Sequence, residues 1–166
     1  MGNLLQRLVM LSYREADKND ARLLFKWAND AEVRGQAFNV EKISWEEHQK
    51  WLQKKMCSSN TKIFILKDGD QSVGQVRLDW DNDQKAIIDV SIDSACRGRG
   101  YGGQGIKLIS EAVVMRGLVK EIVAYVKTDN QASYRSFLKA GYHNDEQKCF
   151  NGVEVYQLSY RVEGDQ

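Results

Sequence analysis

Seven short segments of the chain have the residue pattern of β-strands. In residues 85–92, Ile88, Val90 and Ile92 fall on one face of an extended chain. Asp89 and Ser91 fall on the opposite face. Segments rich in apolar, β-branched and aromatic residues predict strands over residues 8–14, 61–67, 72–80, 85–92, 121–127, 142–150 and 153–161.

Three of the gaps between these strands carry residues that favour tight turns. Asp68-Gly69 joins the second and third predicted strands, and Asn151-Gly152 joins the last two. Asp81-Asn82 provides the turn before residues 85–92. These short connections predict antiparallel pairing, because parallel neighbours need a long crossover.

Apolar residues elsewhere recur three or four positions apart, which is the spacing of one helix face. This spacing predicts helices over residues 20–28, 45–55, 103–116 and 131–139. Ser44 followed by Glu47 predicts a capping box at the start of the second helix. Gly117 and Ala140-Gly141 predict helix ends. Residues 31–43 are expected to be irregular or a short helical turn.

The order of the predicted elements is β-α-α-β-β-β-α-β-α-β-β. It predicts an α/β chain of the α+β type, with a mixed, mostly antiparallel sheet and helices on both faces. This order differs from the strand–helix alternation of a doubly wound Rossmann fold. With 166 residues, of which 42% are hydrophobic, residues 1–166 are expected to form a single domain with a substantial core.

Charge and cysteine content restrict the class of partner. The formal net charge is +1, which argues against nucleic acid or a membrane surface as a partner. No apolar run approaches the roughly 20 residues that span a bilayer. Cys57, Cys96 and Cys149 form an odd, unpatterned set, which favours a reduced, cytoplasmic protein. Two histidines and scattered thiols have no metal-ligand spacing, so no metal is expected.

Residues 87–105 run from a predicted strand into a glycine-rich loop that contains Arg97 and Arg99 and opens a helix. Such a loop binds phosphate well, because its N–H groups are free and the helix N-terminus is partially positive. Gly98-x-Gly100-x-x-Gly103 fits the dinucleotide fingerprint, yet about ninety residues precede it. A P-loop would need lysine where Ile106 stands. A glycine-rich turn without any ligand is a further alternative.

A third motif in this loop, Arg97-x-x-Gly100-x-Gly102, resembles the pyrophosphate loop of GNAT-family N-acetyltransferases. From Asn130 the chain reads NQASYRSFLKAGY, which resembles a second GNAT segment that contacts CoA. The resemblance covers essentially the whole chain and matches the predicted order of elements. It implies acetyl-CoA as co-substrate, bound by Val90, Ser91, Ile92, Arg97, Gly98, Arg99, Gly100, Tyr101, Gly102, Gly103, Asn130 and Phe137.

The same resemblance suggests catalytic residues. GNAT enzymes transfer the acetyl group directly, and a tyrosine seven residues after the conserved asparagine usually protonates the departing thiolate. Phe137 occupies that position here, so Tyr134, one helical turn earlier, is the alternative acid, unless it is simply packed. Asp89 and His48 are the candidate bases, because acyl transfer requires a neutral amine. Cys96 is not expected to form an acyl-enzyme, because no histidine lies near it in the sequence.

The N-terminal half resembles GNAT enzymes that acetylate the 4-amino group of UDP-linked amino-deoxy sugars in pseudaminic acid biosynthesis. The matching elements are Trp27-x-Asn29-Asp30, Phe38-Asn39, Trp45 to His48 with Trp51, and residues 74–77, GQVR. The resemblance implies acceptor contacts from Trp27, Asn29, Asn39, His48, Gln75 and Arg77. Trp51 or Phe38 could stack on the uracil. Trp27 and Trp51 also lie on apolar stripes, which is typical of core residues.

Other functions remain open on the sequence alone. A protein N-terminus or an aminoglycoside is an alternative acceptor, for which an acidic groove would be expected. Glu41, Glu46, Glu47 and the aspartates at 79, 81 and 83 could supply one. A non-catalytic acetyl-CoA-binding module is the other alternative, because Phe137 replaces the usual acid. The expected partner is a small molecule, and the protein is expected to be a monomer or a homodimer.

Overall fold

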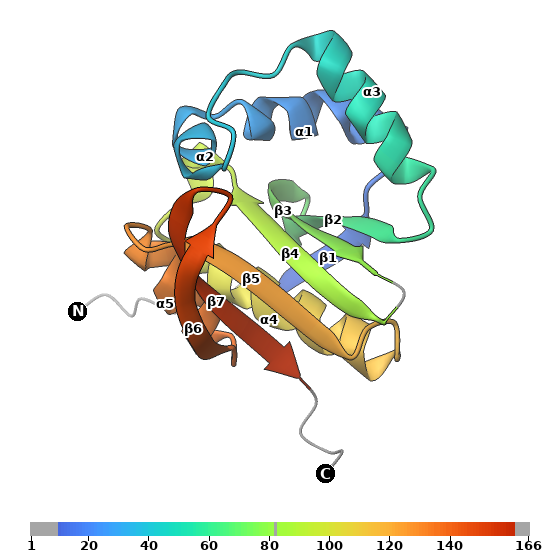
Figure 1. Ribbon diagram of the computed structural model, residues 1–166. Helices are drawn as coiled ribbons and strands as arrows, with labels where there is room; N and C mark the ends of the chain where they lie inside the picture. The colour runs from blue at the N-terminus through green and yellow to red at the C-terminus, as the bar shows by residue number, and fades with distance from the viewer. Residues whose placement is uncertain (1–9, 82, 162–166) are drawn as a thin grey trace, which may run out of the picture.

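The computed structural model describes residues 10–81 and 83–161, which form one seven-stranded sheet with helices on both faces (Figure 1). The strands lie in the order β1-β2-β3-β4-β5-β7-β6. Their bounds are Leu11–Glu15 (β1), Thr61–Asp68 (β2), Gln71–Trp80 (β3), Lys85–Ile92 (β4), Glu121–Lys127 (β5), His143–Phe150 (β6) and Val153–Arg161 (β7). The predicted fold class is therefore confirmed. Residues 8 and 9 of the first predicted strand, and Asn82 of the predicted turn, lie outside the described residues.

The helices also follow the predicted order. They are α1 (Ala21–Ala28), preceded by the 3-10 turn Lys18–Asp20, α2 (Ala31–Gln36), α3 (Trp45–Met56), α4 (Tyr101–Met115) and α5 (Gln131–Lys139). Ser44 and Glu47 form the predicted capping box of α3. The segment expected to be irregular or a short turn contains α2, because Asp30 accepts hydrogen bonds from two N–H groups of its first turn.

The turn glycines explain the two tight hairpins. Gly69, between β2 and β3, has φ of 59°. Asn151 and Gly152 have φ of 49° and 76°, which is the pair of left-handed conformations that a type I′ turn needs. Both hairpins pair antiparallel, as predicted.

Two apolar layers lie on opposite faces of the sheet. Successive residues of β2 pack into one layer and the other in turn, because successive side chains of a strand point to opposite faces. Phe64 and Leu66 pack in the layer that contains α4 and Phe137 of α5. Ile63 and Ile65 pack against α1 and α3. No helix in the described part of the chain is long and apolar enough to cross a membrane.

The centre of the sheet opens between β4 and β5. These strands are parallel and pair only from Lys85–Glu121 to Ile87–Val123. Beyond Ile87, β4 continues to pair with β3, and β5 continues to pair with β7. The two strands therefore diverge, and the backbone edges of residues 88–92 and 124–127 face a gap within the sheet.

Candidate functional site

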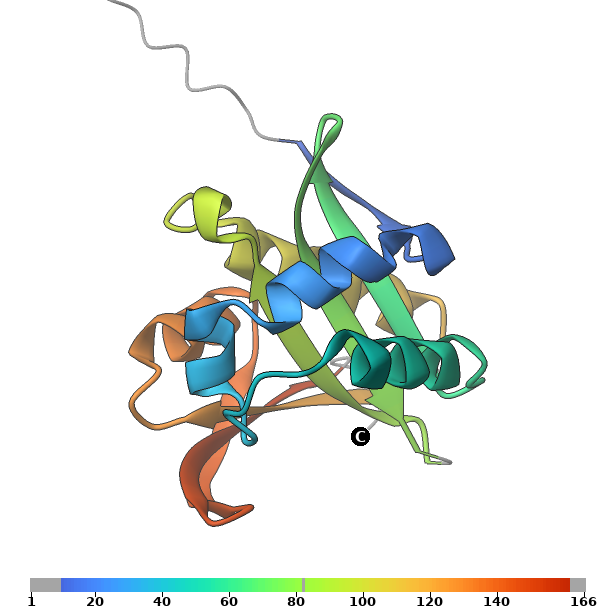
Figure 2. The ribbon, with the colours of Figure 1, turned by 90° about the horizontal axis from the view of Figure 1, so that it is seen from above.

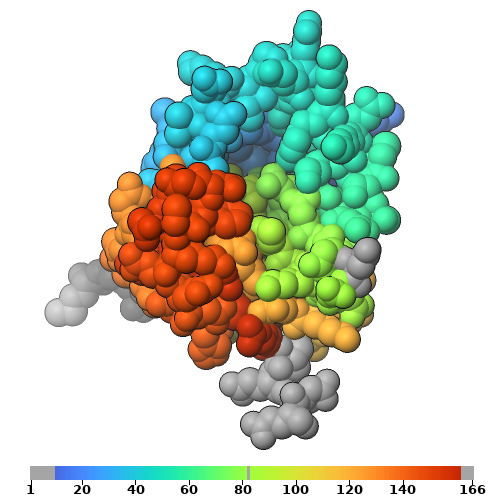
Figure 3. Space-filling view, viewed as in Figure 1, coloured from blue at the N-terminus to red at the C-terminus, as the bar shows by residue number. Residues whose placement is uncertain are grey.

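A cleft of about 1050 Å³ opens at this divergence. Figure 3 shows the hollow between the N-terminal helices, coloured blue to teal, and the strands below them. Figure 2, seen from above, shows α1, α2 and α3 over the strands. The lining residues come from α1, α2, α3, the segment 37–43, β3, the diverging parts of β4 and β5, the loop that leads into α4, the start of α4, Asn130 and α5.

The glycine-rich loop presents free backbone donors to this cleft. Gly98 and Gly100 have φ of 76° and 81°, a conformation that disfavours any side chain. Gly100 is the N-cap of α4, and no side chain caps the first turn of that helix. By contrast, Ser44 caps α3 and Asn130 caps α5. An uncapped N-terminus of a 15-residue helix fits an anionic group such as a diphosphate.

Eleven of the twelve residues predicted to bind acetyl-CoA line the cleft. They are Val90, Ser91, Ile92, Arg97, Gly98, Gly100, Tyr101, Gly102, Gly103, Asn130 and Phe137. Asn130 also accepts a hydrogen bond from the Ser133 N–H at 3.2 Å and so starts α5 beside the cleft. Arg99 is not among the lining residues in the described part of the chain.

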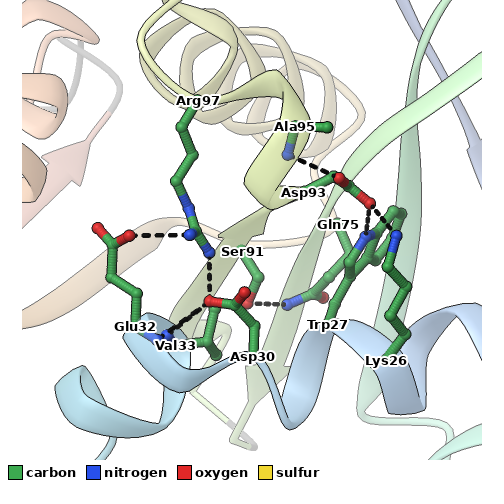
Figure 4. Close-up of polar contacts among 10 residues, drawn as sticks. All are labelled: Lys26, Trp27, Asp30, Glu32, Val33, Gln75, Ser91, Asp93, Ala95 and Arg97. Carbon is green, nitrogen blue, oxygen red and sulfur yellow. Dashed lines mark hydrogen bonds and ion pairs between the residues drawn. The ribbon is translucent and has the colours of Figure 1, made fainter.

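The Arg97 side chain has partners within the protein. Its guanidinium donates to Glu32 at 2.8 Å and to Asp30 at 2.5 Å, so two carboxylates of the α2 region hold it (Figure 4). Arg97 lines the cleft. The sequence pattern did not predict that a segment more than 60 residues away supplies its partners.

Asp89 lies on β4 at the divergence, and its side chain is 49% exposed. Gln75 donates its amide to Asp89 at 3.0 Å, and the Arg77 guanidinium lies 3.6 Å from the same oxygen. Gln75 is buried and also donates to the Ser91 hydroxyl at 3.4 Å. Three predicted site residues, Asp89, Gln75 and Arg77, are thus brought together in the cleft.

His48 lies in the wall of the cleft but is almost fully buried, with 1% of its surface exposed. Its Nε2 lies 3.0 Å from the carbonyl oxygen of Ala21, which can only accept, so Nε2 carries the proton. Desolvation by burial lowers the pKa of His48, so the ring is neutral at pH 7. Aromatic rings of Phe25, Trp45 and Trp51 surround it. This geometry joins α3 to α1 and leaves little of the His48 surface exposed to the cleft.

Tyr134 does not point into the cleft. Its ring packs on Tyr156 with centroids 4.3 Å apart, and it is not among the described residues that line the cleft. The predicted role as general acid is therefore not supported by its position. Phe137, at the position of the usual family tyrosine, is 4% exposed and lines the cleft.

The carboxylates that could supply an acidic groove for a peptide or aminoglycoside acceptor are only partly gathered at the cleft. Glu41 and Glu47 line the cleft, whereas Glu46 and the aspartates at 79, 81 and 83 are not among its lining residues in the described part of the chain. Asp79 accepts hydrogen bonds from Lys55, Thr61 and Arg77, at 2.5, 2.8 and 2.8 Å. These three hydrogen bonds satisfy the Asp79 carboxylate, which does not line the cleft.

The remaining predicted acceptor contacts have mixed outcomes. Asn29 makes two 2.8 Å hydrogen bonds with the backbone of Ile43, which fasten the segment between α2 and α3 and explain its position better than an acceptor contact. Asn39 lines the cleft and accepts from the Glu41 N–H at 3.0 Å. Trp27 borders the cleft but is 2% exposed, so its structural role dominates.

Asp93 is a key residue that sequence reasoning missed. It accepts from the Trp27 indole N–H at 2.7 Å, from Lys26 at 2.9 Å and from the Ala95 N–H at 3.0 Å (Figure 4). The hydrogen bonds from Trp27 and Lys26 lower the pKa of Asp93 to about 2. Asp93 therefore ties α1 to the segment that leads into the glycine-rich loop. Its position directly after a strand was the available signal.

An aromatic cluster at the mouth was also missed. Tyr125 of β5 stacks on Phe150 with centroids 4.1 Å apart, and Phe38 packs edge-on against Phe150 at 5.3 Å. Phe38 is 41% exposed, and Phe38 and Tyr125 line the cleft. The tip of the β6–β7 hairpin thus packs against two residues that line the cleft.

Comparison with known proteins gives a family match. Residues 7–143 match the model of the acetyltransferase (GNAT) domain. The chain is 24% identical over 147 residues to acetyltransferase PseH of Campylobacter jejuni subsp. jejuni serotype O:23/36 (strain 81-176). This similarity covers 88% of the chain and 92% of PseH.

Two solved structures share the fold. Spermidine N-acetyltransferase from Vibrio cholerae, in complex with CoA and spermine, has a TM-score of 0.80 at 17% identity, over 91% of this chain and 95% of its own. Aminoglycoside acetyltransferase AAC(6')-Ib, in complex with coenzyme A, has a TM-score of 0.78 at 14% identity, over 91% of this chain and 94% of its own. At these identities the likeness concerns the fold.

Proposed function

The chain belongs to the GNAT acetyltransferase family, and we propose that it transfers an acetyl group from acetyl-CoA to the 4-amino group of a UDP-linked amino-deoxy sugar. As an acetyltransferase of this family it uses acetyl-CoA as co-substrate. The observation that carries the proposed acceptor is the charge of the cleft, together with the similarity to PseH along most of the chain.

The donor is proposed to lie along the divergent strands. The diphosphate of acetyl-CoA would accept hydrogen bonds from the N–H groups at the N-terminus of α4, which no side chain caps. Asn130 and Phe137 would border the pantetheine, because both line the cleft beyond the loop. The thioester would then reach residues 89–92 of β4, where the unpaired edge of the strand offers backbone groups to the reacting carbonyl.

Acyl transfer at this position needs a group that accepts the proton of the amine and a source of a proton for the departing thiolate. The amine nitrogen attacks the thioester carbonyl carbon, the carbon–sulfur bond breaks, and CoA leaves as the thiolate. Asp89 is the proposed acceptor of the amine proton, directly or through water, because its carboxylate is half-exposed at the divergence of the strands. With Phe137 at the usual acid position, the thiolate takes its proton from water in the open cleft.

The charge of the cleft favours a neutral or anionic acceptor over a polycation. Five basic residues line it: Arg34, Lys42, Arg77, Arg97 and Lys127. Four acidic residues line it: Glu32, Glu41, Glu47 and Asp89. Arg97 pairs with Glu32, and Glu47 caps its own helix. A polyamine or an aminoglycoside carries several positive charges and would require a clear excess of free carboxylates.

Aromatic and polar groups of the cleft suit a nucleotide sugar. The exposed Phe38 ring can stack on a uracil, and Arg77, which lies 5.3 Å above the Trp51 ring, can meet a phosphate. Asn39 and Gln75 can hydrogen-bond sugar hydroxyls. The acceptor amine would lie between these groups and Asp89, opposite the thioester.

We expect the chain to release thiol from acetyl-CoA fastest with a UDP-4-amino-4,6-dideoxy sugar. Parallel assays would use an aminoglycoside, spermidine and a peptide with a free N-terminus as acceptors. The kcat/KM for the UDP-sugar should exceed that for each other acceptor by about tenfold or more, a margin of about 1.4 kcal/mol in transition-state binding. The same sugar with a hydroxyl in place of the 4-amino group should give no release.

Faster turnover of the aminoglycoside, spermidine or peptide would overturn the proposed acceptor. Acetyl-CoA binding without thiol release from any of the four would also overturn it, and would favour a different acceptor or a non-catalytic role. Acetyl-CoA affinity is measured by calorimetry on the same sample. A sample that binds acetyl-CoA is competent, so neither of these two results can then be attributed to an inactive preparation.

A further inference from the structure

Helix α2 forms one wall of the cleft without contributing to the core. None of its six residues is buried, and it belongs to neither of the two apolar clusters. By contrast, α1 contributes Leu24 and Trp27 to an apolar cluster. Polar contacts must therefore hold α2 in place.

Arg97 makes the first of these contacts. One arm of its guanidinium reaches Asp30, the N-cap of α2, and the other reaches Glu32 in the first turn (Figure 4). Asp30 also accepts from the N–H groups of Glu32 and Val33, at 3.1 and 3.2 Å. Arg97 thus binds both the N-cap and the first turn of the helix, in the forked geometry that lysine cannot reproduce.

Lys127 makes the second contact. It donates to the carbonyl oxygen of Gly35, in the last turn of α2, at 3.2 Å. Arg97 follows β4, and Lys127 is the last residue of β5. Helix α2 therefore spans the divergence of the two strands, with one cation from each side of the gap binding one end of the helix.

The segment after α2 is attached to the same helix. Arg34 donates to the carbonyl oxygens of Asn39 and Glu41, at 3.0 and 3.4 Å. Phe38 and Asn39 in this segment line the cleft, in the part where the acceptor is proposed to bind. Any displacement of α2 would therefore carry these two side chains with it.

We propose that Arg97 is a positioning residue for the acceptor. Its side chain holds α2 and the segment 37–41 against the glycine-rich loop and does not bind pyrophosphate. The guanidinium is occupied by two carboxylates, whereas the backbone of the glycine-rich loop is free for the diphosphate. The acceptor part of this inference rests on the proposed function. The attachment of α2 does not, because it is a property of the ligand-free chain.

The test compares Arg97→Gln, the double variant Asp30→Asn with Glu32→Gln, and the triple variant. Asparagine at position 30 still caps the helix, so only the charges are removed. We expect amide hydrogen exchange in α2 to be about tenfold faster in all three variants, with no further increase in the triple variant, since the three residues act as one unit. The Kd for acetyl-CoA should stay within about threefold of the parent value.

In the thiol-release assay with the UDP-4-amino sugar, the KM for the acceptor should rise about tenfold in the three variants, while kcat stays within about threefold. A merely structural surface pair would not give this separation. Lys107→Gln is the matched control, because it breaks the exposed pair with Glu111 on α4, far from α2 in sequence. It should change neither hydrogen exchange in α2 nor either substrate's affinity.

A tenfold weaker affinity for acetyl-CoA in Arg97→Gln, with unchanged exchange in α2, would overturn the proposal and make Arg97 a pyrophosphate ligand. Unchanged exchange together with unchanged affinity would overturn it as well. Exchange and calorimetry need no acceptor, so a wrong acceptor assignment would leave these two readouts intact. Failure of the proposed function is thereby distinguishable from failure of this inference.

Discussion

Replacement of Gly100 by glutamate is expected to weaken acetyl-CoA binding by about 100-fold or more while the protein remains folded. Gly100 has φ of 81° and precedes the uncapped first turn of α4. A glutamate there places a negative charge where the diphosphate is expected, and its side chain would compete for the same N–H groups. The position is exposed, and an added Cβ would meet only the end of the Gln104 side chain, at 3.4 Å.

Calorimetric titration with acetyl-CoA measures this loss, and thermal unfolding checks that the variant is folded. Gly117→Glu is the matched control, because Gly117 follows the other end of α4, is exposed, has φ of 68° and would have open space around a Cβ. It carries the same charge change and the same backbone strain, of order 1 kcal/mol. An unchanged Kd in Gly100→Glu would refute the assignment of the loop.

Replacement of Asp93 by alanine is expected to lower the free energy of unfolding by about 2 kcal/mol at pH 7. Asp93 is 7% exposed, and its carboxylate accepts from the buried Trp27 indole N–H, from Lys26 and from a backbone N–H. Its removal leaves the indole N–H buried without an acceptor, which costs more than the net gain of an ordinary hydrogen bond. Urea unfolding followed by tryptophan fluorescence measures the change.

The contribution of Asp93 should depend on pH in a defined window. Its pKa in the folded chain is about 2, because Trp27 and Lys26 donate hydrogen bonds to the carboxylate. An unfolded aspartate has a pKa of about 3.9. Since the folded pKa is depressed, the stabilisation is fully present above about pH 4 and is lost as the pH falls toward about 2. In Asp93→Ala, this part of the acid-induced loss should be missing.

Asp129→Ala serves as the control for Asp93, because Asp129 is exposed. It should change the free energy of unfolding by no more than about 0.5 kcal/mol. An equal effect of both substitutions, or a stability difference between Asp93→Ala and the parent that does not shrink below pH 4, would contradict the role assigned to Asp93.

Local patterns in the sequence predicted the strands and helices because the relevant interactions are close along the chain. The Ser44–Glu47 box and the Asn151-Gly152 turn each involve residues within a few positions of one another. The cleft position of β4 and of the glycine-rich loop also followed from sequence order, since a strand that enters such a loop places it at the end of the sheet.

Side-chain directions could not be predicted in the same way. Arg97 finds its partners 65 and 67 residues away, and Trp27 finds Asp93 66 residues away. Asn29 has both ends of its amide occupied by Ile43, which a pattern of polar residues does not reveal. Tyr134 lies one turn from Phe137 on the same helix, yet packing on Tyr156 directs it away from the cleft. The direction and the partners of these side chains depend on the tertiary arrangement of elements that are far apart in the sequence.

The central claim is that acetyl-CoA binds where β4 and β5 diverge, with its diphosphate on the glycine-rich loop. A crystal structure of the chain with acetyl-CoA tests it most directly. The account predicts diphosphate oxygens within hydrogen-bond distance of N–H groups in residues 98–103, the thioester beside residues 89–92, and the Arg97 guanidinium still on Asp30 and Glu32. A diphosphate bound away from residues 98–103, or a thioester outside the divergence, would contradict it.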